Sequence, residues 1–488
     1  MTDADFILWL KSDGALRCVL VEAVASVSGS ETTFYLSSRG YVTAGSDTPA
    51  NTVYKPVITG GCVINERLSL DGSGASLAFS DVEIDNAAGD LDAWLGYIWR
   101  NREVRVYLGD MRWERADFRL MFDGVIDDLQ SRARNVLNLV IRDKLQRLNT
   151  PVTETTMGGS TANKDRLIPV LLGECHNIEP LLTNPATLEY QVHGGAMEDF
   201  IEVRDNGVVV SVTESVSTGK FTLSAALKGT ITCSAQGDKP SAYSNTVSKL
   251  VQRLATGYGT DPFDSGDLDA TNLSDFDTAH PQPVGVYLTE RTNVLAVCQA
   301  LAASVGAQVV MSATGLLRLI KLGLPAPGTA VAVNDTTMVQ DSLKIAQRVP
   351  VRPAVRLGYC RNWTVQTALQ TGIPAEHKDL YAKEWLTVTS TDSTVATNYK
   401  LSDEAVQEDT LLLKTTDAQT EADRRRDLRK VQRTVFASRN YADLMLAELG
   451  NAATLTSARF GLSGGVSGQI VAISRDLMAA RVDIEVYT

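Results

Sequence analysis

The stretch Arg166–Val210, RLIPVLLGECHNIEPLLTNPATLEYQVHGGAMEDFIEVRDNGVVV, divides the chain, because the sequences on either side of it have the patterns of separate β-rich bodies. Prolines and glycines interrupt its short apolar runs, at Pro169, Gly173, Pro180, Pro185, Gly194, Gly195 and Gly207. Proline fixes φ and glycine permits positive φ, so the sequence imposes turn geometry at many points. It predicts an ordered connector of strands and turns, without a catalytic motif.

The strongest turn signal in this stretch is Asp205-Asn206-Gly207, which separates the apolar runs Ile201–Val203 and Val208–Val210. A tight hairpin turn requires positive φ, and Asn-Gly adopts that conformation more readily than other residue pairs. We therefore expect a β-hairpin here.

The order and spacing of residues in this region resemble a segment of the baseplate hub proteins of siphophage-type tail tips, a family related to the hubs of contractile tails. The resemblance rests on Ile168-Pro169-Val170, Gly173, Asn177, Pro180-Leu181-Leu182, Pro185, Tyr190-Gln191-Val192-His193, Val203-Arg204-Asp205-Asn206-Gly207 and Gly219-Lys220-Phe221-Thr222-Leu223. Two shorter patterns also resemble the family, Phe122-Asp123-Gly124-Val125-Ile126 and Leu462–Val471. The match is specific over the connector and looser elsewhere.

The resemblance implies a mainly β protein with α+β parts, a multidomain hub with two tube-like antiparallel β-barrel domains and a mixed α/β domain. It implies a homotrimer, because three subunits with two barrels each match a sixfold tube. The implied partners are the distal tail protein, the tape measure protein and the central tip or fibre protein, with genome DNA only in transit through the lumen. The implied location is the tail baseplate of the virion, after assembly in the host cytoplasm.

Composition places the chain among ordinary globular proteins, with 488 residues, 44% of them hydrophobic and 21% charged. The formal net charge of −12 argues against a general nucleic-acid clamp, because such binding neutralises phosphates with Lys and Arg. The densest basic run, Arg424-Arg425-Arg426, is interleaved with acidic residues and predicts a solvated helix or strand edge with mixed ion pairs.

The six cysteines stand singly, at positions 18, 62, 175, 233, 298 and 360. Without CxxC spacing they encode neither a local zinc site nor a redox dithiol, and they fit buried free thiols. The acidic N-terminus and the short apolar run Phe6–Leu10 do not fit a signal peptide. Polar residues and Gly306 interrupt the longest apolar run, Val294–Met311, so no stable membrane insertion is expected.

Residues 1–150 predict an all-β domain with one helix at Asp90–Trp99, which the resemblance implies is an N-terminal β-barrel-like hub domain. Phe6–Lys11 and Leu16–Val21 flank Ser12-Asp13-Gly14 as a hairpin, and a further turn is expected at Asp71-Gly72. The other expected strands are Thr32–Leu36, Val63–Leu70, Ser76–Ile84, Glu103–Leu108, Phe118–Phe122, Gly124–Leu129 and Val136–Arg142.

Residues 151–163 are rich in Thr, Ser and Gly and predict a linker, followed by a β-rich connector domain at 164–240. Residues 241–341 predict a mixed α/β domain, with helices at Ser248–Ala255 and Thr292–Val305 and strands at Ala307–Met311 and Leu316–Leu322.

Residues 342–488 predict a C-terminal β-barrel-like domain with an inserted helix at Tyr441–Leu449 and long exposed excursions over 363–424. The closing strands Gly468–Ser474 and Arg481–Tyr487 are expected to pair antiparallel. The other expected strands are Ala354–Tyr359, Glu384–Thr389, Asp427–Ala437 and Ala458–Leu462.

The search for catalytic, cofactor-binding and metal sites assigns no residue to any of them. His176, His193, His280 and His377 lack metal-site spacing, and we interpret His176, beside Cys175, as a turn or interface residue. The aspartate-rich segment Asp261–Asp277 lacks the spacing of an EF-hand loop and predicts a mobile acidic surface loop, with calcium binding left open.

Gly461-Leu462-Ser463-Gly464-Gly465 matches GxSxG, but a nucleophile elbow needs a helix after the serine and a strand is expected instead, which favours a glycine turn. The absence of a catalytic motif fits a non-enzymatic protein, and the resemblance implies a structural baseplate hub that forms a ring, adapts tube symmetry to the tip and closes or opens the channel. The alternatives are a tail-associated peptidoglycan hydrolase, since paired carboxylates are recognised only by geometry, and a receptor-binding tip module.

Overall fold

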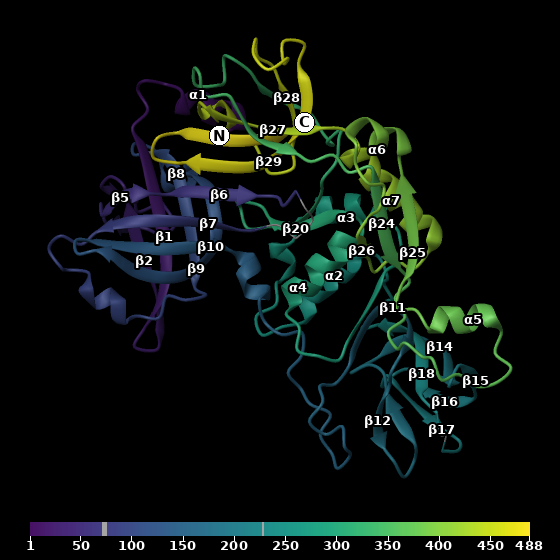
Figure 1. Ribbon diagram of the computed structural model, residues 1–488. Coiled ribbons are helices and arrows are strands. Elements are labelled where there is room, and N and C mark those ends of the chain that lie inside the picture. The colour runs from purple at the N-terminus through teal and green to yellow at the C-terminus, as the bar shows by residue number, and fades with distance from the viewer. Residues whose placement is uncertain (71–75, 227–228) are drawn as a thin grey trace. The chain divides into compact units, whose positions relative to one another are not determined.

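The computed structural model describes residues 1–70, 76–226 and 229–488. It is mainly β with several antiparallel sheets and few helices, as the sequence predicted (Figure 1). The chain divides into two compact units: unit 1 comprises Met1–Arg147, Val309–Pro350 and Gln432–Thr488, and unit 2 comprises Leu148–Gln308 and Val351–Val431. The predicted turn at Asp71-Gly72 lies outside the described residues.

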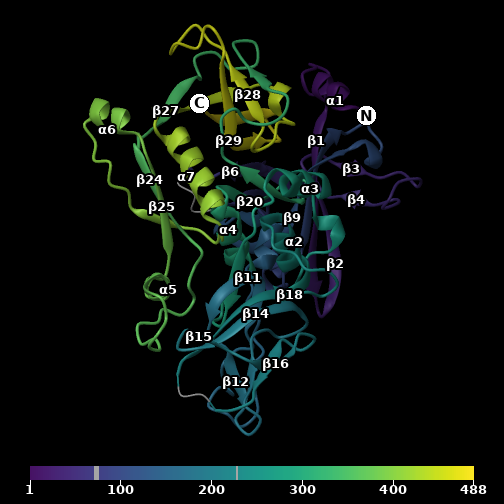
Figure 2. The same ribbon diagram turned by 90° about the vertical axis from the view of Figure 1, so that its right-hand side faces the viewer.

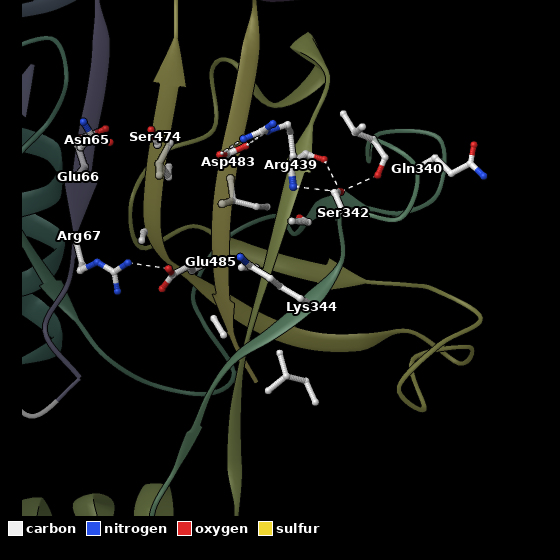
Figure 3. Close-up of a pocket in the computed structure, with 18 of the residues that line it drawn as sticks. Asn65, Glu66, Arg67, Gln340, Ser342, Lys344, Arg439, Ser474, Asp483 and Glu485 are labelled. Carbon is white, nitrogen blue, oxygen red and sulfur yellow. Dashed lines mark hydrogen bonds and ion pairs between the residues drawn. The ribbon is translucent and has the colours of Figure 1, made fainter. Parts of the chain in front are cut away.

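Unit 1 is built on one large sheet whose main path runs β2-β1-β8-β9-β10-β7-β6-β29-β30-β27-β23 (Figure 3 shows the β27 end). Three short strands join it off the path, β5, β22 and β28. From the first part of the chain come β1 (Arg17–Val27), β2 (Ser30–Ser37), β5 (Ile58–Gly61), β6 (Val63–Arg67), β7 (Ser76–Asp85), β8 (Glu103–Asp110), β9 (Arg119–Ala133) and β10 (Val136–Asp143). From the later parts come β22 (Val331–Val333), β23 (Lys344–Val349), β27 (Arg433–Asn440), β28 (Ala452–Leu455), β29 (Val466–Asp476) and β30 (Arg481–Tyr487).

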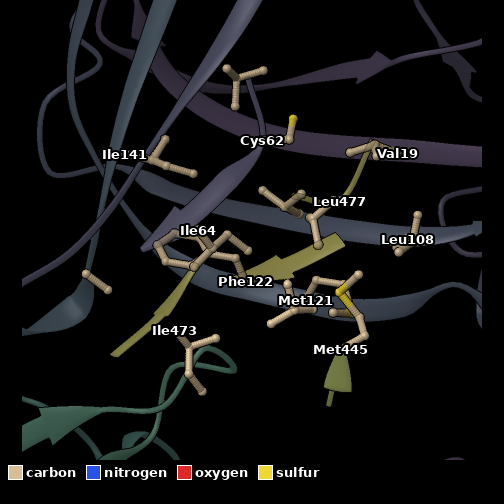
Figure 4. Packing of buried hydrophobic residues seen from close by; sticks show 14 of the residues in the cluster. Val19, Cys62, Ile64, Leu108, Met121, Phe122, Ile141, Met445, Ile473 and Leu477 are labelled. Atoms are coloured by element: carbon tan, nitrogen blue, oxygen red, sulfur yellow. The ribbon is translucent and has the colours of Figure 1, made fainter. Parts of the chain in front are cut away.

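The beginning and the end of the chain meet in this sheet where β6 pairs antiparallel with β29, with Ser474 opposite Asn65. Behind the sheet, one hydrophobic core draws on both parts: Ile64 and Phe122 from the first and Ile473 and Leu477 from the last (Figure 4). Because burial of apolar area is the main favourable term in folding, this shared core commits both segments to one folded unit.

The N-terminus corrects a prediction: Phe6–Lys11 is not a strand, because α1 (Asp3–Leu10) occupies this segment. Thr2 caps the helix by accepting a hydrogen bond from the Asp5 amide at 3.2 Å, and Asp3 and Asp5 lie in the first turn, where the helix dipole favours negative charge. Phe6 and Leu10 pack into the core.

Two expected helices of unit 1 are reduced to single 3₁₀ turns, η1 (Asp92–Gly96) and η5 (Ala442–Leu444). Near η5, Arg475 donates to the carbonyls of Met445 (3.2 Å) and Ala447 (2.5 Å). In an α-helix over Tyr441–Leu449 the Met445 carbonyl would have accepted from the Leu449 amide instead. The strand expected at Ala458–Leu462 is also wrong, because Phe460 and Gly461 both have positive φ and form a turn.

The remaining elements of unit 1 are short. They are the hairpin strands β3 (Tyr41–Val42) and β4 (Val53–Tyr54), the 3₁₀ turn η2 (Arg115–Asp117), and β21 (Leu317–Lys321), which pairs with β20 (Ala307–Met311); η3 (Lys144–Leu148) ends the first segment.

Unit 2 holds a five-stranded sheet, order β15-β14-β18-β11-β19, and a four-stranded sheet, order β12-β13-β17-β16. The predicted hairpin is confirmed, with Asn206 (φ 44°) and Gly207 (φ 87°) turning β14 into β15. Residues 151–163 contain no regular element among those the structure describes. The strands are β11 (Val170–Ile178), β12 (Leu181–Asn184), β13 (Glu189–Gln191), β14 (Met197–Asp205), β15 (Val208–Val210), β16 (Val212–Ser215), β17 (Lys220–Leu223), β18 (Ile231–Asp238) and β19 (Gly285–Leu288).

The two helices predicted from apolar periodicity are confirmed as α2 (Val247–Gly257) and α4 (Val294–Ser304), which pack on each other. The aspartate-rich segment between them is helical rather than a loop. Asp264 and Asp267 cap η4 (Ser265–Asp267) reciprocally, and Asp269 caps α3 (Ala270–Ala279). These carboxylates serve as helix caps, which orders the segment.

The later part of unit 2 contains α7 (Thr415–Arg429), which lies along β24 (Ala354–Tyr359) and β25 (Leu386–Thr391) (Figure 2). The strand expected at Asp427–Ala437 is therefore wrong in its first residues, and β27 begins at Arg433. The segment 363–424, expected to form long exposed excursions, contains regular elements: α5 (Ala375–Tyr381), α6 (Ser393–Tyr399) and β26 (Gln407–Asp409). Among the described residues, no helix is both long and apolar enough to cross a bilayer.

The basic run on α7 is not a solvated face, because Arg425 is buried. Its guanidinium donates to Glu421 on the same helix (2.8 Å), to Glu408 (2.7 Å) and to the carbonyl of Ala303 in the last turn of α4 (2.6 Å). Arg425 thus caps the C-terminal end of α4.

Candidate assembly surface

The polar face of the unit 1 sheet is hollowed near one end into an open groove of about 940 Å³ (Figure 3). Side chains from β7, β6, β29, β30, β27 and β23 line it, together with the turn before β23, and they include the exposed apolar Phe79 and Ile345. The charged residues labelled along it are Glu66, Arg67, Lys344, Arg439, Asp483 and Glu485.

Two cross-strand ion pairs cover the floor of the groove. Arg439 on β27 lies opposite Asp483 on β30 and contacts both of its carboxylate oxygens, at 2.9 and 3.2 Å. Arg67 on β6 reaches Glu485 on β30 at 2.6 Å, across the intervening strand, where both residues have the small Ala472 as their neighbour. Directly opposite residues such as Arg439 and Asp483 are close enough for an ion pair, whereas the long side chain of Arg67 spans two strand spacings over Ala472.

The same face carries further ion pairs toward the other end of the sheet. Arg132 contacts Asp81, Arg142 contacts Asp127 at 2.8 Å, and Lys144 contacts Asp123 at 3.0 Å. In each of these three pairs a carboxylate neutralises the neighbouring cation.

Behind the groove, on the core side of the sheet, Arg475 of β29 pairs with Glu66 of β6. Both side chains are only 4% exposed. This buried pair connects the first and last parts of the chain, and Arg475 is also held by the two carbonyls near η5.

The sheet ends on both sides in an exposed edge strand. In β23, five of the six residues are exposed, from Lys344 to Arg348, and the described residues add no strand to its outer edge. In β2, Ser30–Thr33 are exposed, whereas the outer edge near Leu36 is bridged by Lys55. Open edges present unpaired N–H and C=O groups and favour pairing with another chain.

The residues considered as candidate ligands do not come together. His176 contacts Glu174 at 3.2 Å, and this hydrogen bond lowers the pKa of Glu174. His193 is buried: its Nδ1 accepts from the Leu171 amide at 3.2 Å and its Nε2 faces Asp238 at 3.3 Å. His280 follows α3 and His377 lies on α5.

No group of three potential metal ligands occurs in the described ranges. All six cysteines are free; Cys360 is partly exposed and the other five are buried, close to the prediction. Ser463 lies in the turn between β28 and β29, and a strand follows it, so the geometry of a nucleophile elbow is not formed there.

Sequence reasoning missed the ion-pair face of the sheet. A signal was present in the alternation of charged and apolar residues in Arg481-Val482-Asp483-Ile484-Glu485. Alternation assigns such residues to one face of a strand, but it does not identify their partners on other strands.

Comparisons with known proteins give a match only at the level of structure. No protein-family model matches the sequence, and no curated protein matches it. Tail proteins are among its structural neighbours. The 43 kDa tail protein of prophage MuSo2 from Shewanella oneidensis is 10% identical, with a TM-score of 0.41 over 96% of this chain and 98% of that one.

The tail protein from Neisseria meningitidis MC58 is 9% identical, with a TM-score of 0.41 over 97% of this chain and 96% of that one. A chain of the native gene transfer agent virion is 13% identical, with a TM-score of 0.42 over 70% of this chain and 90% of that one. These similarities are distant, and they assign neither a partner nor a residue role to this chain.

Proposed function

We propose that this protein is a structural baseplate hub of a phage-type tail tip, which forms a homotrimeric ring in the virion. The ring would adapt the symmetry of the tail tube to a central tip or fibre protein, contact the distal tail and tape measure proteins, and close or open the channel for DNA. The proposal rests on the residues of the connector that resemble hub proteins and on the construction of unit 1.

The observation that carries the proposal is the pair of open edges on one sheet, β2 at one end and β23 at the other. A sheet with two different open edges can add a second copy at each edge, and such head-to-tail contacts form a ring when the rotation closes. The exposure of β23 on both faces supports this role, because the strand covers no core in the single chain.

The test is the mass of the purified protein by light scattering, together with electron microscopy of tails made without it. A hub predicts self-association at high protein concentration and aborted tail assembly. Ile345→Lys, at an apolar side chain on β23 that is 40% exposed, is expected to weaken self-association. Val209→Lys, on the β15 edge of unit 2 and 59% exposed, is the matched control and is expected to leave it unchanged.

A chain that stays monomeric at all concentrations, with tails that mature normally without it, would contradict the hub. Release of soluble fragments from peptidoglycan by the purified protein would support a hydrolase instead. Direct adsorption of the protein to host cells would support a receptor-binding module.

A further inference from the structure

We infer that an open pocket in unit 2 binds the carboxylate group of a small organic acid. The pocket has a volume of about 240 Å³, and all of its lining residues belong to unit 2. They come from three neighbouring strands of the five-stranded sheet, β11, β18 and β14, and from the segment that runs from the end of β24 to the start of β25. The volume is below the range of about 300–1,000 Å³ for drug-sized ligands, so the ligand is small.

Two β-bulges shape the sheet side of the pocket. In β11, two residues, His176 and Asn177, stand opposite the single residue Ser234 of β18. In β14, an extra residue precedes Glu202, which is also opposite Ser234. All four of these residues line the pocket. A bulge bends the strand and changes the direction of its side chains, and bulges are frequent beside functional sites.

Asn177 is the residue that points to a ligand. Its φ of 52° is left-handed, and its backbone amide donates to the Ser234 hydroxyl at 3.3 Å instead of to a strand carbonyl. The residue is only 8% exposed, yet its side-chain amide forms no hydrogen bond with any part of the chain that the structure describes. Because nearly all buried polar groups have a hydrogen-bond partner, an unpaired amide that borders a pocket indicates a polar ligand.

The charges around the pocket favour an anion. The Glu202 carboxylate is neutralised by Arg204 at 2.6 Å, and the Arg361 guanidinium is neutralised by Glu384 at 2.9 Å. Lys383 also lines the pocket; it is exposed and forms no ion pair within the described ranges. A carboxylate accepts hydrogen bonds both from an ammonium group and from a side-chain amide, so Lys383 and Asn177 together match it.

The remaining lining favours an organic acid over a bare inorganic anion. Leu380, Tyr381 and Leu386 contribute apolar surface to the same pocket. Small-molecule sites typically combine such apolar surface, which takes the hydrocarbon part of the ligand, with a few polar groups that orient it.

The experiment measures the binding of benzoate and benzamide to the full-length protein by saturation-transfer NMR and titration calorimetry. The two probes have nearly the same shape and differ in charge. Benzoate is expected to bind, and benzamide is expected to bind at least about threefold more weakly, because it lacks the charge that Lys383 attracts.

Two variants test the assigned residues. Lys383→Gln removes the exposed positive charge and is expected to weaken benzoate binding about three- to tenfold. Asn177→Gly removes the side-chain amide, while glycine tolerates the positive φ, and a similar loss is expected. The matched control is Lys378→Gln, an exposed position on α5 outside the pocket lining, which should leave the affinity unchanged.

Three results would overturn the inference: no benzoate binding at millimolar concentration, equal affinity for benzoate and benzamide, or equal losses in Lys383→Gln and Lys378→Gln. Far-UV circular dichroism checks the folding of Asn177→Gly. If that variant unfolds, the exposed Lys383 still provides the test. None of these results depends on ring formation, which the mass measurement tests separately.

Discussion

Two regions of the molecule use arginine–carboxylate pairs in opposite ways. On the unit 1 sheet, Arg439 and Asp483 pair in the open, with side chains 61% and 49% exposed. In unit 2, Arg425 and Glu421 pair inside the fold, with side chains 10% and 7% exposed. Burial, rather than the identity of the charged residues, therefore decides whether an ion pair belongs to the accessible surface or contributes to the packing of helices and strands.

The largest expected effect is at Arg425. Arg425→Met leaves the Glu421 and Glu408 carboxylates and the Ala303 carbonyl without their common donor, and we expect unit 2 to lose about 3–5 kcal/mol of stability. Chemical denaturation followed by far-UV circular dichroism measures it. Arg426→Met, on the same helix with a side chain 22% exposed, is the control and should cost clearly less. Equal losses of stability at both positions would show that burial does not decide how much an ion pair contributes to stability.

The second test concerns the buried pair in unit 1. Glu66→Leu or Arg475→Met alone leaves one charge in the core and is expected to cost about 3–5 kcal/mol. The double variant should lose less stability than the two single variants together, because no unpaired buried charge remains. Additive losses would show that the two side chains are not energetically coupled.

The third test uses pH at Asp110, which lies fully buried under α1. Its carboxylate accepts from Arg112 at 2.7 Å, from the indole of Trp9 at 2.9 Å and from the Leu16 amide at 2.9 Å. The hydrogen bond from Arg112 contributes most to holding the pKa of Asp110 below its ordinary value. The charged form is thus favoured in the folded state, so this stability is present above the unfolded value of about 3.9 and is lost as pH falls below it.

Asp110→Ala is expected to cost about 1–3 kcal/mol at neutral pH, because buried donors lose their acceptor. It should also flatten the acid limb of the stability profile, measured as the thermal midpoint against pH. An unchanged acid limb would show that other carboxylates govern acid denaturation.

The smallest effect is expected at the exposed pair. Arg439→Ala, Asp483→Ala and the double variant should leave the denaturation midpoint within experimental error of the wild type, because solvent screens this pair. A double-mutant cycle checks this. A coupling as large as that of Glu66 and Arg475 would show that this exposed pair contributes to the stability of the fold.

The elements that the sequence predicted correctly are those in which neighbouring residues decide the conformation. Asn206-Gly207 determined the hairpin through positive φ, and apolar spacing determined α2 and α4. α1 was missed although Thr2 and Asp5 were visible as a capping signal, because the short apolar run was paired with Leu16–Val21 across the turn signal Ser12-Asp13-Gly14. α7 was not predicted either, because the basic run was left as a helix or a strand edge. Its charged residues have helical spacing, with pairs at i+3 and i+4, but lack an apolar stripe.

What the sequence by itself determined, then, is local: turns, periodic helices, the mainly β class and the resemblance of the connector to tail hubs. The tertiary structure alone decided that β6 pairs with β29, that Glu66 meets Arg475, and that Arg425 is buried while Arg439 is exposed. The physical reason is that strand pairing and burial depend on residues hundreds of positions apart. Alternation along one strand determines which residues share a face. It does not determine which strand pairs with it or which elements pack on each face.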